Sequence, residues 1–389
     1  MEGNCIAHAE AKWAALNLGA LARRQTDLAA RLQRCLEGAG LPPPPDAPVT
    51  ALTELWREVL DHPGPRLVFG AGALCAYPGG GAGRGASLVV DRSAESLAVA
   101  LRDAALWGDL EAGRVLLASP QSEFDLIEEA KRFLTSGDEP ATPFLAFTPG
   151  LVPEEAETYR RWGESVLRFL EFCRDPTVLN LEMYARFKLV ADRIHALGAD
   201  GLRVLDVGGR EWVFSAFLPR YRVTVADLET TGLDGRALPF PPQSFDIVTA
   251  HHLLEHVPDG DRLDLLAELV RVAKRRVYLT GPFSESPFAA EIDRLLSQLA
   301  PENPYLQEHL RLGLPSLARV EAWLDAHGLP YAVEPITRCN TWLLALALNP
   351  LQESRPEIYR EVTRYYNRRF QEMDRGEPSY QHLIDIRVA

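Results

Sequence analysis

Long apolar runs, an export leader and paired cysteines are all missing from this sequence of 389 residues. No apolar run approaches the roughly 20 residues that span a bilayer, so the sequence predicts no membrane span. The amino terminus, MEGNCIAHAEAKW, has no basic segment followed by an apolar one, which argues against a secretory signal. We therefore expect a cytoplasmic protein.

The sequence also has few cysteines, and its basic residues are outnumbered by acidic ones. The cysteines are odd in number and widely spaced, and none forms a CxxC pair, which argues against a disulfide framework or a cysteine zinc site. The net charge of -13 opposes attraction to a phosphate backbone, so no nucleic-acid partner is expected and small or neutral substrates are favoured. Free thiols are expected at Cys5, Cys35, Cys75, Cys173 and Cys339.

Two tracts of the chain alternate short apolar runs with helical patterns, which is typical of parallel sheets. The first contains PRLVFGAG, ASLVVD, RVLLAS and PFLAF, together with a loop PGGGAGRG and a helical pattern over residues 94–107. We expect the chain to begin with a helical segment and linker at 1–62, which includes a helix over 7–38. An α/β domain at 63–150, a helical connector at 151–196, a second α/β domain at 197–349 and a tail packed on the core at 350–389 are expected to follow.

The second tract predicts one sheet. RVLDVG, RVTVADL, FDIVTA and RVYLTG are typical of buried strands with helices between them. The closing runs YAVEPI and NTWLLALAL have no helical pattern between them, which predicts an antiparallel hairpin at the sheet edge. The charged and aromatic tail after Pro350 is expected to pack on this domain.

Two acidic residues end neighbouring strands of the second tract. Asp206 precedes Gly208 and Gly209 at the end of the first strand, and Asp227 ends the second. Such strand ends meet in the crevice where ligands bind in open parallel sheets, and an acid on the second strand typically holds ribose hydroxyls. The GxGxxG pattern of nicotinamide sites is missing. A carboxylate at this turn instead favours a cationic cofactor with an amino group over a pyrophosphate.

Residues 180–349 resemble class I S-adenosylmethionine-dependent methyltransferases through several motifs. VLDVGG is similar to the family's first motif and VADLE to its second. DGRALPFPPQSFDIV resembles the loop and fourth strand, and HHLLEHVP resembles the LEHVP segment. Arg210 and Trp212 stand where family turns commonly have glycine, so the turn is either reshaped or less open to a cofactor.

The resemblance implies S-adenosylmethionine as the cofactor and a fold of the α/β class. That fold is a Rossmann-like methyltransferase sheet with an antiparallel C-terminal hairpin, plus a smaller N-terminal α/β domain and helical segments. Asp206 and Gly208 would line the methionine half, Asp227 the ribose, and Asp234 the adenine amino group, with Arg236 nearby. The expected cofactor-binding residues are Asp206, Gly208, Gly209, Asp227, Asp234, Arg236 and His251.

Three histidines follow the predicted strand FDIVTA, in the region where methyl acceptors bind in this fold. His252 is the expected catalytic base, because an imidazole titrates near neutral pH and can take a proton as the methyl group arrives. His256 is the second catalytic candidate, with core packing or backbone capping as its alternative. His252, Glu255 and His256 fall at i, i+3 and i+4, a spacing that suits a divalent metal and is similar to a site in small-RNA 2'-O-methyltransferases, but no metal is predicted.

The expected function is methyl transfer from S-adenosylmethionine to a hydroxyl of a sugar, glycoconjugate or small metabolite. YLTGPF, LQEHLRLGLP and YYNRR resemble a bacterial subgroup that often accompanies glycosyltransferases, which favours a glycan or small-molecule acceptor. One alternative is a catalytically silent cofactor-binding protein with the same fold. The other is an NAD-dependent oxidoreductase, which would retain Asp227 but lacks the phosphate-binding glycines.

The first α/β tract also places a glycine turn and an acid, Asp91, at adjacent strand ends. VFGAG and LVVDRSAESLAVAL resemble the N-terminal Rossmann-like part of motility accessory factor glycosyltransferases. A lone GxG is common in structural turns between a strand and a helix. We therefore expect a non-catalytic domain that presents substrate or forms a homodimer.

Overall fold

The computed structural model describes residues 64–70, 87–92, 115–118, 120, 122–135, 141–147, 151, 153–209, 212–286, 288–299 and 301–388. The chain divides into two compact units, residues 1–170 and 171–389, and each is described by itself. Several expectations lie outside the described residues: the helices over 7–38 and 94–107, the loop PGGGAGRG and the effect of Arg210 on the glycine turn.

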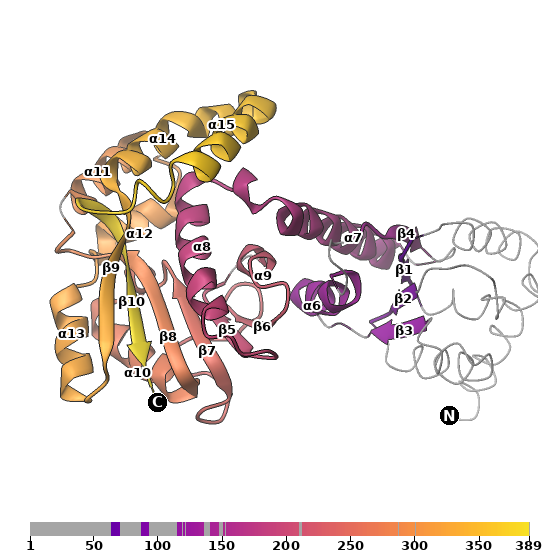
Figure 1. Ribbon diagram of the computed structural model, residues 1–389, viewed down its shortest axis with the longest axis horizontal. Helices are drawn as coiled ribbons and strands as arrows, with labels where there is room; N and C mark the ends of the chain where they lie inside the picture. Colours follow the sequence, from indigo (N-terminus) through magenta and orange to yellow (C-terminus); the bar gives the residue numbers. More distant parts are fainter. Residues whose placement is uncertain are drawn as a thin grey trace, which may run out of the picture. The chain divides into compact units, whose positions relative to one another are not determined.

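The N-terminal unit contains a parallel sheet, as predicted. Its strands lie in the order β3-β2-β1-β4 (Figure 1). All side chains of β1 are buried, as expected for a strand that is covered on both faces. The strands are β1 (Arg66–Phe69), β2 (Ser87–Val90), β3 (Val115–Ala118) and β4 (Phe144–Phe147), and helix α6 (Glu123–Leu134) precedes β4.

Helix α7 (Pro153–Arg174) follows β4 in the chain. Tyr159, Trp162 and Phe169 are buried at helical spacing along it. A Cβ at Gly163 would lie 3.0 Å from the Leu145 side chain of β4, so glycine permits a close approach of helix to strand. The boundary between the two units falls inside this helix.

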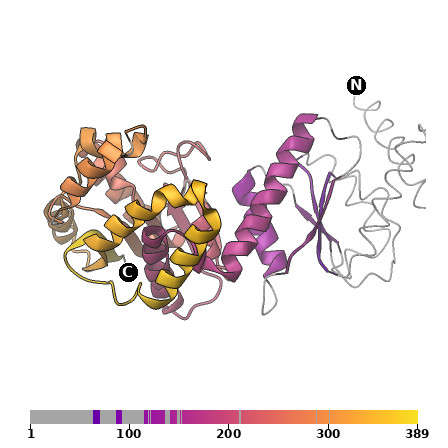
Figure 2. The same cartoon turned by 90° about the horizontal axis from the view of Figure 1, so that it is seen from above.

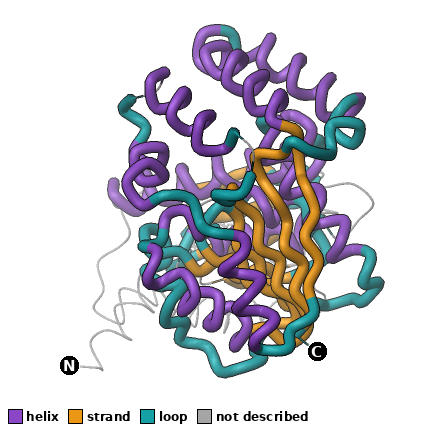
Figure 3. The backbone as a smooth tube through the Cα atoms, turned by 90° about the vertical axis from the view of Figure 1, so that its left-hand side faces the viewer, coloured by secondary structure: helices purple, strands orange, loops and turns teal. Residues whose placement is uncertain are grey.

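The C-terminal unit contains a six-stranded sheet in the order β6-β5-β7-β8-β10-β9 (Figure 1, Figure 3). The four strands predicted to be buried and parallel are present and pair in parallel. Strand β10 runs antiparallel between β8 and β9. The bounds are β5 (Arg203–Val207), β6 (Arg222–Ala226), β7 (Phe245–His251), β8 (Ala273–Pro282), β9 (Tyr331–Arg338) and β10 (Ser379–Arg387).

The predicted antiparallel pair is present, but its second strand was wrongly assigned. NTWLLALAL is not a strand: it lies in helix α14 (Cys339–Ser354), which buries Thr341, Ala345 and Leu348 at helical spacing. Leucine and alanine are strong helix formers, and a short apolar run does not by itself distinguish a strand from a buried helix. The partner of β9 is instead β10, from the tail of the chain.

Helices cover both faces of the C-terminal sheet. Apolar side chains of β5, β7, β8 and β10 pack with α10 and α13 in one core cluster. Helices α8, α14 and α15 pack together through Leu181, Ala345, Leu348 and Tyr359 (Figure 2). The helices are α8 (Leu181–His195), α9 (Val213–Ala216), α10 (Arg262–Val272), α11 (Ala289–Leu299), α12 (Pro304–Leu312), α13 (Leu317–Ala326) and α15 (Pro356–Arg369), with 3-10 turns η1 (Pro176–Val178), η2 (Leu254–His256) and η3 (Asp259–Asp261).

None of the helices in the described residues is both long and apolar enough to cross a membrane.

Strand β10 should contribute strongly to stability, because Ile384 is fully buried in the main core cluster. We expect Ile384→Ala to lower the free energy of unfolding by about 2 to 5 kcal/mol, the usual cost of such a truncation in a packed core. Urea denaturation measures it, with Ile358→Ala as the matched control because Ile358 is 42% exposed on α15. Equal losses in the two variants would contradict a core position for β10.

Candidate functional site

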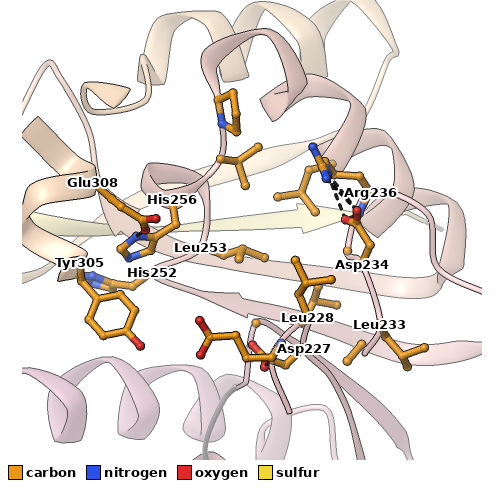
Figure 4. Close-up of a pocket in the computed structure, with 18 residues that line it drawn as sticks. Asp227, Leu228, Leu233, Asp234, Arg236, His252, Leu253, His256, Tyr305 and Glu308 are labelled. Atoms are coloured by element: carbon orange, nitrogen blue, oxygen red, sulfur yellow. Dashed lines mark hydrogen bonds and ion pairs between the residues drawn. The ribbon is translucent and has the colours of Figure 1, made fainter. Parts of the chain in front are cut away.

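The carboxyl ends of β5, β6 and β7 open on a cavity of about 480 Å³. In Figure 4, Asp234 and Arg236 lie at one end of this pocket, and His252 and His256 lie at the other. All residues that line it belong to the C-terminal unit. The predicted site residues among them are Gly208, Asp227, Asp234, Arg236, His252 and His256.

The glycine turn after β5 is sterically closed to larger residues. Gly208 has a positive φ of 73°, and a Cβ there would lie 2.8 Å from the Leu253 side chain. A Cβ on Gly209 would lie 2.2 Å from a carboxylate oxygen of Asp206. Trp212 is buried at the start of α9 and contacts Phe172, with ring centroids 5.9 Å apart. Trp212 therefore supports the turn without lining the pocket.

Asp206 lies beneath this turn and does not line the pocket. Its Oδ1 accepts a hydrogen bond of 2.8 Å from the hydroxyl of Thr249 on β7, and the side chain is buried. Burial raises the pKa of Asp206 to about 7. The structure therefore places Asp206 and Gly209 behind the pocket wall, where they shape the turn.

Asp227 lines the pocket at the end of β6. Its Oδ1 accepts hydrogen bonds from the backbone amides of Glu229 and Thr230, at 3.0 and 2.8 Å, and from the Thr230 hydroxyl at 3.0 Å. These contacts fix the turn after β6. All three involve Oδ1, which leaves Oδ2 to accept a donor from the pocket.

Asp234 and Arg236 form an ion pair at the end of the pocket that lies opposite His256. Arg236 donates to both carboxylate oxygens of Asp234 and also to Asp261, at 2.7 Å. Hydrogen bonding to Arg236 holds the pKa of Asp234 below its ordinary value. Asp234 is therefore a fixed carboxylate at this end of the pocket.

The three neighbouring histidines occupy different environments. His251 does not line the pocket: its ring packs on Phe187 and Phe214, with centroids 4.9 and 4.5 Å away. Its Nδ1 lies 3.1 Å from the Thr280 hydroxyl. Burial lowers the pKa of His251 well below its ordinary value, so this ring is neutral. His251 is separated from the pocket that His252 and His256 line.

His252 lines the pocket and has both ring nitrogens occupied. Its Nδ1 lies 3.0 Å from Oε1 of Glu255, and its Nε2 lies 2.8 Å from Oε1 of Gln381 on β10. Nδ1 can donate to the Glu255 carboxylate, and Nε2 faces the side-chain amide of Gln381. A group that approaches Nε2 from the pocket therefore has to displace Gln381.

Glu255, next to His252, is fully buried. Burial alone would raise the pKa of its carboxyl group, but the imidazoles of His252, His256 and His309 lower that pKa to about 2. Glu255 is therefore a carboxylate inside the protein. These imidazoles come from η2, from the turn between β7 and η2, and from α12.

The sequence spacing missed one member of this group. Glu255 and His256 lie on a 3-10 turn and not on the α-helical face that the spacing suggested. His309, on α12, brings its Nε2 to within 3.4 Å of the His256 Nε2. One ligand-type atom from each of Glu255, His256 and His309 lies within 4.8 Å of the others. No periodicity connects residues 53 positions apart, so only the fold reveals this neighbour.

Residues 215–280 match the family model described as a methyltransferase domain. The match confirms the predicted class for this part of the chain: residues 215–280 are similar to methyltransferase domains. The match runs from α9 through β8 and contains Asp227, Asp234 and the histidines. It does not favour the NAD-dependent alternative.

Solved structures similar to this chain include the magnesium protoporphyrin IX methyltransferase of Synechocystis with bound SAH, at 13% identity, a TM-score of 0.35 and coverage of 54% of this chain and 85% of that one. The YcgJ protein of Bacillus subtilis is 20% identical, with a TM-score of 0.30 and coverage of 52% and 95%. A SAM-dependent methyltransferase from Aquifex aeolicus is 13% identical, with a TM-score of 0.30 and coverage of 51% and 89%. No curated protein matches the sequence.

The cofactor of this class is S-adenosylmethionine, and the described pocket suits it. The turn at Gly208 has no room for a Cβ, so backbone lines the pocket there. Asp227 and Asp234 place carboxylates on the pocket wall, and carboxylates can accept hydrogen bonds from hydroxyl and amino groups.

Asp227→Asn should weaken binding of S-adenosylhomocysteine by about 1 to 3 kcal/mol, because ribose hydroxyls would lose a charged acceptor. Asparagine can still accept the backbone hydrogen bonds of the turn through its oxygen, so the fold is retained. Calorimetric titration measures the affinity, with Asp264→Asn on the exposed side of α10 as the matched control. Unchanged affinity in Asp227→Asn would show that this acid does not hold the ribose.

The raised pKa of Asp206 predicts a pH-dependent stability. Below its folded pKa of about 7 the native protein holds a proton that the unfolded chain, with an ordinary pKa of 3.8, has released. Asp206 therefore makes stability fall as pH rises from 5 to 8, by about 2 to 3 kcal/mol. Asp206→Asn should remove that loss in urea denaturation, whereas Asp264→Asn should keep it. An unchanged pH dependence in Asp206→Asn would contradict the buried, protonated acid.

Proposed function

We propose that this domain transfers a methyl group from S-adenosylmethionine to a hydroxyl of a sugar, glycoconjugate or small metabolite. The observation that carries the proposal is the layout of the pocket. Carboxylates suited to ribose and adenine lie toward one end, and imidazoles and a glutamate, His252, His256 and Glu308, lie at the other. A hydroxyl must lose a proton when it is methylated, and this end supplies groups that can receive it.

The proposed roles follow the pocket from end to end. Asp234 faces the adenine amino group and is held by Arg236. Asp227 accepts from the ribose, and the backbone at Gly208 lies along the methionine part. This order directs the reacting end of the cofactor toward His252 and His256. When bound, S-adenosylmethionine supplies an electrophilic methyl group.

His252 is the proposed proton acceptor. Its backbone amide donates to the Thr280 carbonyl at 2.8 Å, which fixes the residue at the end of β7. His252 would receive the proton of the acceptor hydroxyl as that oxygen is methylated. An approaching hydroxyl can replace Gln381 as the partner of Nε2, which lies 2.8 Å from that side chain. Positioning of the two reactants supplies the larger part of the rate.

The parallel sheet of the N-terminal unit is proposed to form a separate domain without the cofactor site. The support is that, among the residues that the structure describes, those lining the pocket lie between 207 and 308. Its proposed role is to present the acceptor.

Replacing His252 tests the proposed function. Asparagine is the suitable substitute, because His252 has a positive φ of 51°, which asparagine tolerates. His252→Asn should lower the methyl-transfer rate roughly 100-fold while leaving affinity for S-adenosylhomocysteine nearly unchanged. The measurement is transfer of labelled methyl to a panel of sugars, nucleotide sugars and small alcohols, with products identified by mass spectrometry. His327→Asn, an exposed histidine after α13, is the control.

Two results would count against the proposal. Parental turnover in His252→Asn would remove its role as proton acceptor. Methylation confined to amines, with no hydroxyl product from the panel, would remove the hydroxyl acceptor.

A further inference from the structure

Two imidazoles face each other at the acceptor end of the pocket. His256, on η2, and His309, on α12, have their Nε2 atoms 3.4 Å apart. His256 and the neighbouring Glu308 line the pocket, whereas His309 is buried behind them. Figure 4 shows Glu308 beside the ring of His256.

The other nitrogen of each ring contacts a carboxylate. Nδ1 of His256 lies 2.9 Å from Oε2 of Glu308, and Nδ1 of His309 lies 3.1 Å from Oδ2 of Asp293. Asp293 also accepts from the hydroxyl of Tyr380 on β10. A carboxylate at Nδ1 keeps the proton on that nitrogen, so in each neutral ring the lone pair is on Nε2. Two such lone pairs facing each other are stabilised by a proton or a metal ion between them.

Glu255 provides a negative charge at the same point. Its side chain is fully buried; Oε1 lies 3.0 Å from Nδ1 of His252, and Oε2 has no hydrogen-bond partner among the described residues. A buried carboxylate is normally satisfied by hydrogen-bond donors or by a cation. Glu255 is therefore a buried charge whose Oε2 can still coordinate a cation beside two imidazole nitrogens.

We propose that Glu255, His256 and His309 bind a divalent transition-metal cation, of the Zn²⁺ or Mn²⁺ kind, at the acceptor end of the pocket. Two ligands of a tetrahedral zinc site lie about 3.4 Å apart when each is about 2.1 Å from the metal. The two Nε2 atoms are 3.4 Å apart, and the three donor atoms all lie within 4.8 Å. Two imidazoles and one carboxylate favour a transition metal over Mg²⁺ or Ca²⁺, which prefer oxygen ligands.

The surrounding residues fit the same assignment. Glu308 and Asp293 hold the two rings in the required tautomer, as carboxylates do for the histidine ligands of many metal sites. A site with three protein ligands keeps positions for an exogenous oxygen ligand. Since His256 lines the pocket, these positions are within reach of an acceptor.

The role of this metal in methyl transfer rests on the proposed function. A divalent cation lowers the pKa of an oxygen bound to it, and so would help an acceptor hydroxyl lose its proton to His252. A metal at this place would favour acceptors whose hydroxyl oxygen can bind it.

Direct metal binding by the full-length protein tests the proposal. The tag-free chain is freed of metal with a chelator, dialysed, and titrated separately with Zn²⁺ and Mn²⁺ by calorimetry and chelator competition. We expect one tight site per chain, and a loss of about 100-fold or more in affinity for the preferred metal in His309→Ala and in Glu255→Gln. His382→Ala is the matched control, because His382 is as buried as His309 and also contacts a carboxylate, that of Glu377, outside this cluster.

Binding of S-adenosylhomocysteine, measured on the same samples, separates the two proposals. Metal binding that His309→Ala abolishes, with affinity for S-adenosylhomocysteine retained in that variant, supports the site. A folded parent that binds S-adenosylhomocysteine but neither metal overturns the metal site and leaves the proposed function standing. Equal metal affinity in the parent and His309→Ala overturns it as well. Metal binding without hydroxyl methylation in the panel overturns the proposed function alone.

Discussion

The buried charge of Glu255 is the constraint on which the acceptor end of the pocket depends. A carboxylate with no exposure is costly unless positive charge or donors surround it, and here that compensation comes from imidazoles of separate elements. His252 follows β7, His256 lies on η2 and His309 lies on α12. The turn after β7 and helix α12 therefore meet near Glu255, at one end of the pocket.

Strand β10 connects this charge cluster to the sheet. Its Gln381 contacts Nε2 of His252, and its Tyr380 donates to Asp293, which in turn holds His309. Because β10 is hydrogen-bonded to strands on both sides, these two side chains are fixed in place by the sheet. The tail of the chain therefore both completes the sheet and positions two residues near the pocket.

Most strands of the C-terminal sheet, and the acid at the end of β6, could be predicted from local sequence. The runs that became β5 to β8 were recognisable because buried parallel strands are continuously apolar, and Asp227 because it ends the second of them. The rest depended on contacts that no local pattern encodes. NTWLLALAL lies in a helix, and the strand beside β9 comes from the tail instead. Asp206 belongs to the first motif, but its carboxylate lies under Gly209 and accepts a hydrogen bond from Thr249. His309 joined His256 only through the packing of α12 on η2.

A crystal structure of the full chain with S-adenosylhomocysteine is the most direct test of the site as a whole. The account predicts the adenine amino group at Asp234, ribose hydroxyls at Oδ2 of Asp227, and the sulfur directed toward His252 and His256. A ligand bound in the reverse direction, with adenine against His256, or bound outside this pocket, would contradict it.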